Sequence, residues 1–219
     1  MIGITPFTSA TKASQRIDPW TYLIENKRIL VLRGAIVPEV PTSISGMVVP
    51  HMNVGALMDT MIALDVLEVK PIKLIIDSEG GAAADGLALF DTMQSLRSPV
   101  YTIGRGTCAS MAAILLVSGA PGRRYAFPNC SLMLHMARGA ASGDRKEREA
   151  REKNLREYEE RIADIIRRHC AKSQSTDEIL REWFEESELW MFAEKALEYG
   201  LIDKVITPEV YREEIVGEN

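Results

Sequence analysis

The chain has 219 residues, and 46% of them are hydrophobic, which is enough for one large domain with a buried core. Its formal net charge is −5, and lysine and arginine are interspersed with acidic residues, so no basic surface for nucleic acid is predicted. The N-terminus lacks the pattern of a secretory signal, and no apolar run is long enough to span a bilayer. These features predict a cytoplasmic protein without membrane contact.

The metal-binding residue types are sparse and scattered. No C-x-x-C spacing joins the three cysteines, and no helical ligand pair joins the three histidines. Reduced thiols are therefore expected in place of a disulfide framework or a zinc knuckle, and neither a metal nor a cofactor is predicted. The cysteines are Cys108, Cys130 and Cys170.

The first part of the chain alternates between irregular and regular segments. Residues 1–27 are polar and predict a tail, whereas residues 28–34 read as a buried strand ended by glycine. The stretch 37–53 is rich in proline, serine and glycine, which predicts a loop or an insertion. From Val54 the apolar residues recur at helical spacing, and residues 73–77 then form a second buried strand.

The middle of the chain continues this alternation of strands and helices. A helix is predicted over residues 83–97, a strand over 100–103, a wholly apolar helix over 110–117 and a strand over 132–135. Strands that are apolar throughout, and not at every second residue, are typical of parallel sheets covered on both faces. An α/β fold built from repeated βαβ units is therefore predicted.

The pattern changes after residue 138. Residues 144–170 form a long, highly charged helical segment whose apolar residues make only a narrow stripe. A solvated helix face is the plain interpretation of the charge, and the length favours an element that projects from the domain. Two shorter helices, at residues 176–186 and 193–199, then lead into a last strand at 201–206.

Ser110 is the first candidate for chemistry. It follows a predicted strand and begins the apolar helix, where unpaired backbone N–H groups and the helix dipole can stabilise an oxyanion. Serine is also a common helix N-cap, so a purely structural role stays open. The G-x-S-x-G elbow is absent, so an α/β-hydrolase is not indicated.

His135 and the turn at residues 77–81 complete the set of candidates. His135 ends an apolar strand, where it is either a structural histidine or the base that makes a serine nucleophilic at neutral pH. The turn follows a buried strand at the end where open α/β sheets bind ligands. Its paired glycines either satisfy a tight turn or bring a backbone N–H to a reacting carbonyl.

Several ordered segments resemble one family, the Clp protease proteolytic subunit, ClpP, over nearly the whole chain. They read ILVLRG, LIIDSEGG, DTMQSL, GTCASMAAILL, PNCSLMLH and EYGLIDKVI. The resemblance implies a ClpP/crotonase-like α/β fold of repeated βαβ units with a projecting handle helix. It also implies a division of the chain into an N-terminal tail and axial loop (1–27), a head (28–137 and 173–219) and a handle (138–172).

The resemblance also implies the roles of individual residues. Ser110 matches the family nucleophile, His135 matches its base, and Glu188 falls on the position of the family's third residue, an aspartate. Gly81 and Met111 match the two oxyanion-hole positions, each acting through its backbone N–H. The handle strand, on which the family lays substrate peptides through main-chain hydrogen bonds, matches Gly139, Ala140, Ala141, Ser142 and Gly143.

The chain departs from the family pattern at four places. Glu188 replaces an aspartate, Met136-Ala137 replace Gln-Pro, and Ser187 replaces an arginine that helps join the rings. The fourth departure is the insertion at 37–53. The extra methylene of Glu188 moves its carboxylate by about 1.5 Å unless the backbone compensates. Glu185 and Glu186 are alternative acids if the register is shifted.

The activity implied by the resemblance is that of a serine endopeptidase inside two stacked heptameric rings, without a cofactor. Its partner would be an AAA+ unfoldase that hydrolyses ATP and feeds unfolded proteins into the chamber. A non-catalytic structural subunit of such a ring remains an alternative. An acyl-CoA enzyme of the crotonase superfamily, which shares the fold, is another. A cysteine nucleophile at Cys108 or Cys130 is a third.

Overall fold

A computed structural model describes residues 19–37, 43–44, 47–48, 54–136, 144–170, 175, 178–179, 181 and 188–217. The predicted handle strand 139–143 lies outside these residues, as do Glu185, Glu186 and Ser187, residues 1–18 and most of the insertion at 37–53. Within the described part of the chain, no helix combines the length and the apolar character needed to cross a membrane. The same residues contain no group of three or more His, Cys, Asp or Glu arranged to hold a metal ion.

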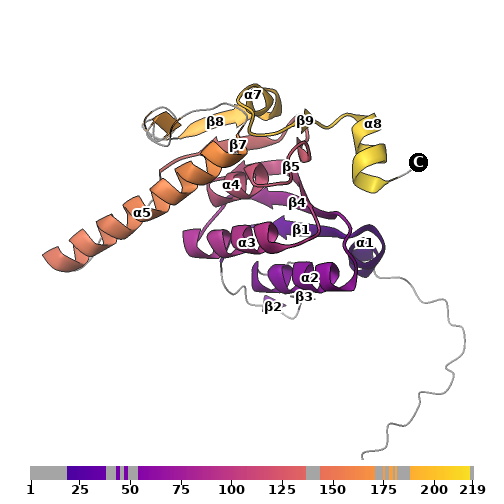
Figure 1. The fold of residues 1–219 in the computed structure, drawn as a ribbon, viewed down its shortest axis with the longest axis horizontal. Helices are drawn as coiled ribbons and strands as arrows, with labels where there is room; N and C mark the ends of the chain where they lie inside the picture. The colour runs from indigo at the N-terminus through magenta and orange to yellow at the C-terminus, as the bar shows by residue number, and fades with distance from the viewer. Residues whose placement is uncertain are drawn as a thin grey trace, which may run out of the picture.

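A mixed seven-stranded sheet forms the centre of the molecule (Figure 1). Its parallel series runs in the order β1 (Ile29–Arg33), β4 (Ile72–Ser78), β5 (Val100–Ala109), β6 (Arg124–Ala126) and β9 (Lys204–Val205). A branch adds two further strands: β7 (Ser131–Leu134) pairs with β5, and β8 (Leu189–Phe192) pairs with β7. The predicted α/β class is confirmed, with one difference: β8 runs antiparallel to β7.

The long strand β5 belongs to both branches of the sheet. Residues 102–104 pair with β6, whereas residues 107–109 pair with β7. Between these segments the register with β4 shifts, and Gly106 adopts a φ of 63°. A side chain at Gly106 would lie 2.6 Å from Oδ1 of Asp77, so the bend requires glycine. The predicted strand 100–103 therefore continues through this bend to Ala109.

Helices cover both faces of the sheet (Figure 1). They are α1 (Pro19–Lys27), α2 (Val54–Leu67), α3 (Ala83–Ser95), α4 (Met111–Val117), α5 (Arg145–His169), α7 (Ala193–Glu198) and α8 (Pro208–Val210), which runs into a π-helical turn (Tyr211–Val216). On one face α2 contacts α3, α3 contacts α4, and α4 contacts α5. On the other face the C-terminal turn places Ile215 against Ile103 and Tyr125.

The apolar helix α4 lies at the centre of the core. All seven of its residues are buried, as the sequence predicted for a helix without a polar face. It packs against the sheet and against α3 and α5. These contacts hold the helix that Ser110 immediately precedes.

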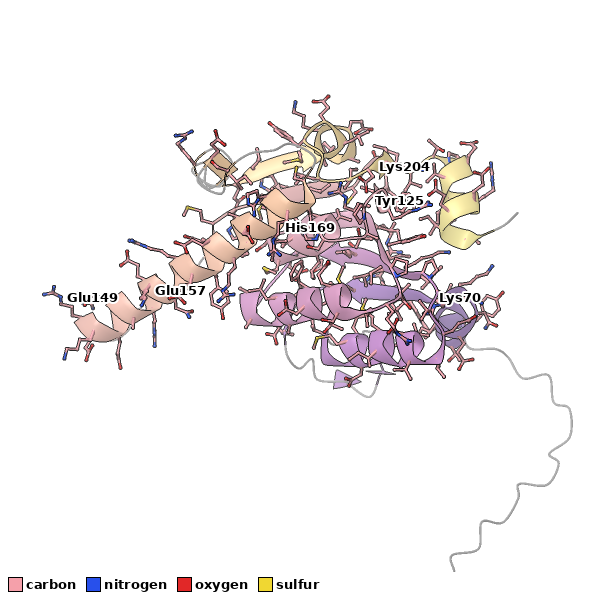
Figure 2. The ribbon with its side chains drawn as sticks, in the orientation of Figure 1. Lys70, Tyr125, Glu149, Glu157, His169 and Lys204 are labelled. Atoms are coloured by element: carbon pink, nitrogen blue, oxygen red, sulfur yellow. The ribbon has the colours of Figure 1, made fainter. Side chains whose placement is uncertain are left out.

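The predicted projecting helix is α5, and it extends beyond the head (Figure 1). It begins with a capping box in which Asp144 and Glu147 each accept the other's backbone N–H. Its buried residues all lie in the second half: Ile162, Ala163, Ile165 and Ile166. Figure 2 shows charged side chains, among them Glu149 and Glu157, around the half that leaves the head.

Most of the remaining predicted elements are present, and the differences concern short segments. Residues 19–27, the end of the predicted tail, form α1, and the last strand contracts to Lys204–Val205. β6 and β8 were not predicted, because strands of three and four residues are too short to show a period. Most of the predicted helix 176–186 lies outside the described residues.

Candidate active site

Ser110 occupies a strained backbone position between β5 and α4. Its φ is 56° and its ψ is −127°, a conformation that costs a non-glycine residue about 1–3 kcal/mol. Two backbone hydrogen bonds hold it there. The Ser110 N–H donates to the Met133 carbonyl at 2.8 Å, and the Ser110 carbonyl accepts from the Ala113 N–H at 3.0 Å. Its side chain makes no capping hydrogen bond to the described start of α4, so the plain N-cap interpretation is not supported.

The glycine turn before α3 is packed directly against Ser110. A side chain at Gly80 would lie 2.5 Å from the Ala109 carbonyl oxygen and 2.7 Å from Cβ of Ser110. Gly80 also has a φ of 89°, which glycine adopts without strain. The turn therefore requires glycine both for its dihedral angle and for its close approach to Ser110.

The parallel pairing of β5 with β7 brings His135 to the same end of the sheet. Ala109 pairs with Met133, so Ser110 lies one residue beyond the pair and His135 two residues beyond it. The His135 side chain is partly buried, and its Nδ1 atom is shielded from solvent. Ser110 and His135 line the same cavity. Two residues that are 25 positions apart in the sequence are thus brought together by strand register.

Glu188 reaches this end of the sheet through the antiparallel pairing of β7 with β8. Leu134 pairs with Leu189. Because the strands are antiparallel, the residue after Leu134, His135, lies opposite the residue before Leu189, Glu188. Side chains at directly opposite positions lie on one face, with Cβ atoms about 5 Å apart. The indole Nε1 of Trp190 donates a hydrogen bond of 2.8 Å to Oε2 of Glu188.

Gly81 and Met111, the two residues expected to supply oxyanion donors, both line the cavity beside Ser110. Gly81 forms a parallel β-bridge with Ile36, in which the Ile36 N–H donates to the Gly80 carbonyl and the Ala82 N–H donates to the Ile36 carbonyl. The Gly81 N–H takes no part in this bridge and is directed away from Ile36. The Met111 N–H belongs to the first residue of α4, where a helix offers no internal acceptor. Among the described residues neither amide has an acceptor, and both residues line the cavity.

The cavity has a volume of about 480 Å³ and lies between the sheet end and α5. The sheet side contributes Ser110, His135 and the glycine turn. The wall from α5 is mainly apolar and consists of Asn154, Leu155, Tyr158 and Ile162. This volume accommodates a large side chain next to a reacting carbonyl.

Asp77 anchors the turn on the side away from the cavity. Its carboxylate forms ion pairs with Arg33 at 3.7 Å and with Arg105 at 3.5 Å, and the Thr107 N–H donates to it at 3.5 Å. These contacts join β1, β4 and the bend of β5. The Gly80 N–H in turn donates to Oγ of buried Ser78 at 3.0 Å. The turn is thus held at both of its ends.

The cysteines do not offer a second nucleophile. Cys108 and Cys130 are fully buried with their sulfurs 3.8 Å apart, and the Cys108 thiol donates to the Ile76 carbonyl at 3.2 Å. The contact with Cys130, together with burial, raises the pKa of Cys108 well above its usual range. A protonated, buried thiol is a poor nucleophile, so this alternative is not supported.

Some residues that line the cavity were not identified from the sequence. Leu155, Tyr158 and Ile162 belong to the narrow apolar stripe that the sequence shows on the long helix, and no site was predicted there. In the structure these three residues form part of the cavity wall. Glu79 also lines the cavity, and its place between Ser78 and the paired glycines is the only signal the sequence offers.

A comparison with known protein families supports the resemblance. The family model described as Clp protease matches residues 39–209. The matched region begins within the insertion and ends in α8, so it contains Ser110, His135, Glu188 and the cavity wall from α5.

Proposed function

This chain belongs to the Clp protease family of peptidases, and we propose that it is a serine endopeptidase with Ser110 as its nucleophile. The observation that carries the proposal is the meeting of Ser110, His135 and two amides without acceptors, among the described residues, around one cavity. A hydroxyl, a base and a pair of oxyanion donors are the groups that acyl transfer requires. The fixed position of Ser110 beside Met133 keeps the hydroxyl at this sheet end.

In the first step the Ser110 hydroxyl attacks the carbonyl carbon of the peptide bond, and His135 accepts its proton. The carbonyl oxygen becomes an oxyanion that accepts hydrogen bonds from the N–H groups of Gly81 and Met111. His135 then transfers the proton to the departing amine, which leaves an acyl ester on Ser110. Water activated by His135 hydrolyses that ester.

Glu188 is the third member of the site in this proposal. The pairing of Leu134 with Leu189 supports it, because the next residues in register are His135 and Glu188. A carboxylate opposite the imidazole orients its ring and stabilises the imidazolium that forms during attack. The hydrogen bond from Trp190 limits the freedom of the long glutamate side chain.

Further parts of the proposal follow from the family. Residues 139–143 would hold the substrate backbone as an added strand, which gives broad sequence tolerance. The working form would be two stacked heptameric rings in the cytoplasm, coupled to an AAA+ unfoldase that hydrolyses ATP. The projecting half of α5 is consistent with a contact between subunits, because it buries no residue within the chain.

Covalent labelling tests this proposal directly. The assembled full-length chain is incubated with a fluorophosphonate, and the modified residue is identified by mass spectrometry after digestion. The expected result is an adduct on Ser110, loss of the adduct in Ser110→Ala, and cleavage of short fluorogenic peptides without ATP. Absence of an adduct in assembled protein would contradict the serine mechanism.

The non-catalytic ring subunit remains a second candidate, and one observation favours it. The family's aspartate is replaced by the longer Glu188, and Oε2 of this side chain accepts a hydrogen bond from Trp190. If the chain is such a non-catalytic subunit, its mass from size-exclusion chromatography should be that of a ring. Ser110 should then take no label, and the protein should cleave no peptide. The same two measurements separate the candidates.

A further inference from the structure

Glu79 places a carboxylate at the rim of an otherwise uncharged cavity wall. The side chain is exposed, whereas Met111, Ile114 and Leu134 of the same cavity are buried. Among the described lining residues, Glu79 is the only carboxylate, and no lysine or arginine lines the cavity. A ligand that fills the cavity would therefore contact apolar side chains along its length, and its end near the opening would lie close to the negative charge of Glu79.

The position of Glu79 is fixed by its neighbours. It lies between Ser78, whose Oγ accepts from the Gly80 N–H, and Gly80, which packs on Ser110. The turn carries one other carboxylate, that of Asp77, which is paired with Arg33 and Arg105. Within the described part of the chain, Glu79 has no such cation, so its charge is available to a bound ligand.

The opposite wall suits a long aliphatic stem. Leu155, Tyr158 and Ile162 lie on one face of α5 and close the cavity beside Ser110. Lysine and arginine have such stems and end in a cation, and they commonly bury the stem while the charge stays near water. The cavity thus combines an apolar channel with an anion at its rim.

We propose that Glu79 determines specificity, and that it favours substrates with lysine or arginine at the residue whose carbonyl is attacked. This inference rests on the proposed function, because the attacked carbonyl must lie at Ser110 for its side chain to enter the cavity. The stem contacts the wall from α5, and the cation pairs with the Glu79 carboxylate. A charge-assisted contact at a partly exposed site corresponds to a preference of about three- to tenfold.

Three fluorogenic peptides that differ at this single residue test the inference in the assembled full-length protein. The residue is lysine, norleucine, which has a similar stem but no charge, or leucine. We expect kcat/KM to be about three- to tenfold higher for lysine than for norleucine at low salt. The ratio should fall towards one in about 0.5 M NaCl because salt screens the pair.

Variants at Glu79 then separate charge from shape. Glu79→Gln should bring the lysine-to-norleucine ratio close to one, Glu79→Asp should retain a ratio above one, and Glu79→Lys should bring it below one. Glu157→Gln is the matched control, because Glu157 is exposed on α5 and does not line the cavity. Its ratio should equal that of the unmodified protein.

The outcomes distinguish this inference from the proposed function. If Ser110 is labelled and the peptides are cleaved, but the ratio is one or less or is the same in Glu79→Gln, then the specificity inference is wrong and the protease stands. If no peptide is cleaved and Ser110 takes no label, then both fail. A ratio that is lost in Glu79→Gln and kept in Glu79→Asp supports the charge as the cause.

Discussion

The indole Nε1 of Trp190 donates a 2.8 Å hydrogen bond to Oε2 of Glu188, two residues before it. Trp190 is 52% exposed, so burial alone does not account for the position of its ring. Residues two apart in an extended segment lie on one face, and the same face carries the position opposite His135. The tryptophan therefore restricts a glutamate that has one more rotatable bond than an aspartate.

Replacement of Trp190 by phenylalanine removes the hydrogen-bond donor and keeps an aromatic ring. One lost hydrogen bond to a carboxylate corresponds to about 1–2 kcal/mol, so kcat/KM for a fluorogenic peptide should fall by roughly five- to thirtyfold. Phe192→Leu is the control, since Phe192 is also an exposed aromatic of β8. Equal rates in both variants would show that Trp190 does not position Glu188.

Variants of Glu188 test the third member of the site. Glu188→Ala and Glu188→Gln should each lower kcat by about 10²- to 10⁴-fold, because the imidazolium loses its counter-charge. Glu188→Asp should retain or raise activity, since it restores the family's residue. Steady-state cleavage of a short peptide measures these rates. An unaltered rate in Glu188→Ala would transfer the role to Glu185 or Glu186.

Ser110→Gly should separate stability from activity. Because φ at Ser110 is 56°, glycine relieves strain, and the free energy of unfolding should rise by about 1 kcal/mol. Activity and fluorophosphonate labelling should both disappear. Ser110→Ala keeps the strain, so it should lose activity with little change in stability. Urea denaturation of the three proteins checks this order, and a less stable glycine variant would contradict it.

Gly80→Ala should disturb the site, because the new Cβ would lie 2.5 Å from the Ala109 carbonyl oxygen. The turn before Ser110 has to move, and a displacement near 1 Å is expected to lower kcat by about a hundredfold. Gly122→Ala is a matched control: Gly122 also has a positive φ, of 77°, but no described atom lies within 4 Å of the added carbon. The control should lose some stability and keep its activity.

The ion pair of Arg124 with Asp203 should make stability depend on pH. Arg124 is buried, and its Nη2 lies 2.6 Å from Oδ1 of Asp203. Burial alone would raise the pKa of Asp203, but the hydrogen bonds from Arg124 outweigh it and lower the pKa below its ordinary value. A lowered folded-state pKa stabilises the fold above the unfolded pKa, and this stabilisation is lost as the pH falls through the folded value.

Asp203→Asn should therefore cost about 2–3 kcal/mol at pH 7 and progressively less below the ordinary pKa of 3.8. The free energy of unfolding, measured in urea from pH 7 to pH 2, should differ between variant and parent by a constant amount above the ordinary pKa and by a shrinking amount below it. Asp59→Asn, at an exposed position on α2, is the control and should track the parent throughout. A difference between Asp203→Asn and parent that stays constant over the whole pH range would rule out this linkage.

The sequence was sufficient for the fold class and for most of the regular elements. Helices α2, α3 and α5 were predictable because apolar spacing along one segment reports which face is buried, and α4 because its segment is apolar throughout. Ser110 and His135 could be selected from their places at the ends of such segments. The short strands β6 and β8 could not, because three or four residues carry too little periodicity.

Tertiary structure decided how these segments meet. Only the pairing of β7 with β8 sets Glu188 opposite His135, and only the bend at Gly106 lets β5 pair with both β6 and β7. The cavity wall from α5 likewise depends on where that helix packs. Periodicity is a local property, whereas strand register and helix docking depend on contacts between residues far apart in the chain. The sequence by itself therefore determined the elements and the candidate nucleophile and base, and packing alone decided that Glu188 lies opposite His135 and that a cavity lies beside Ser110.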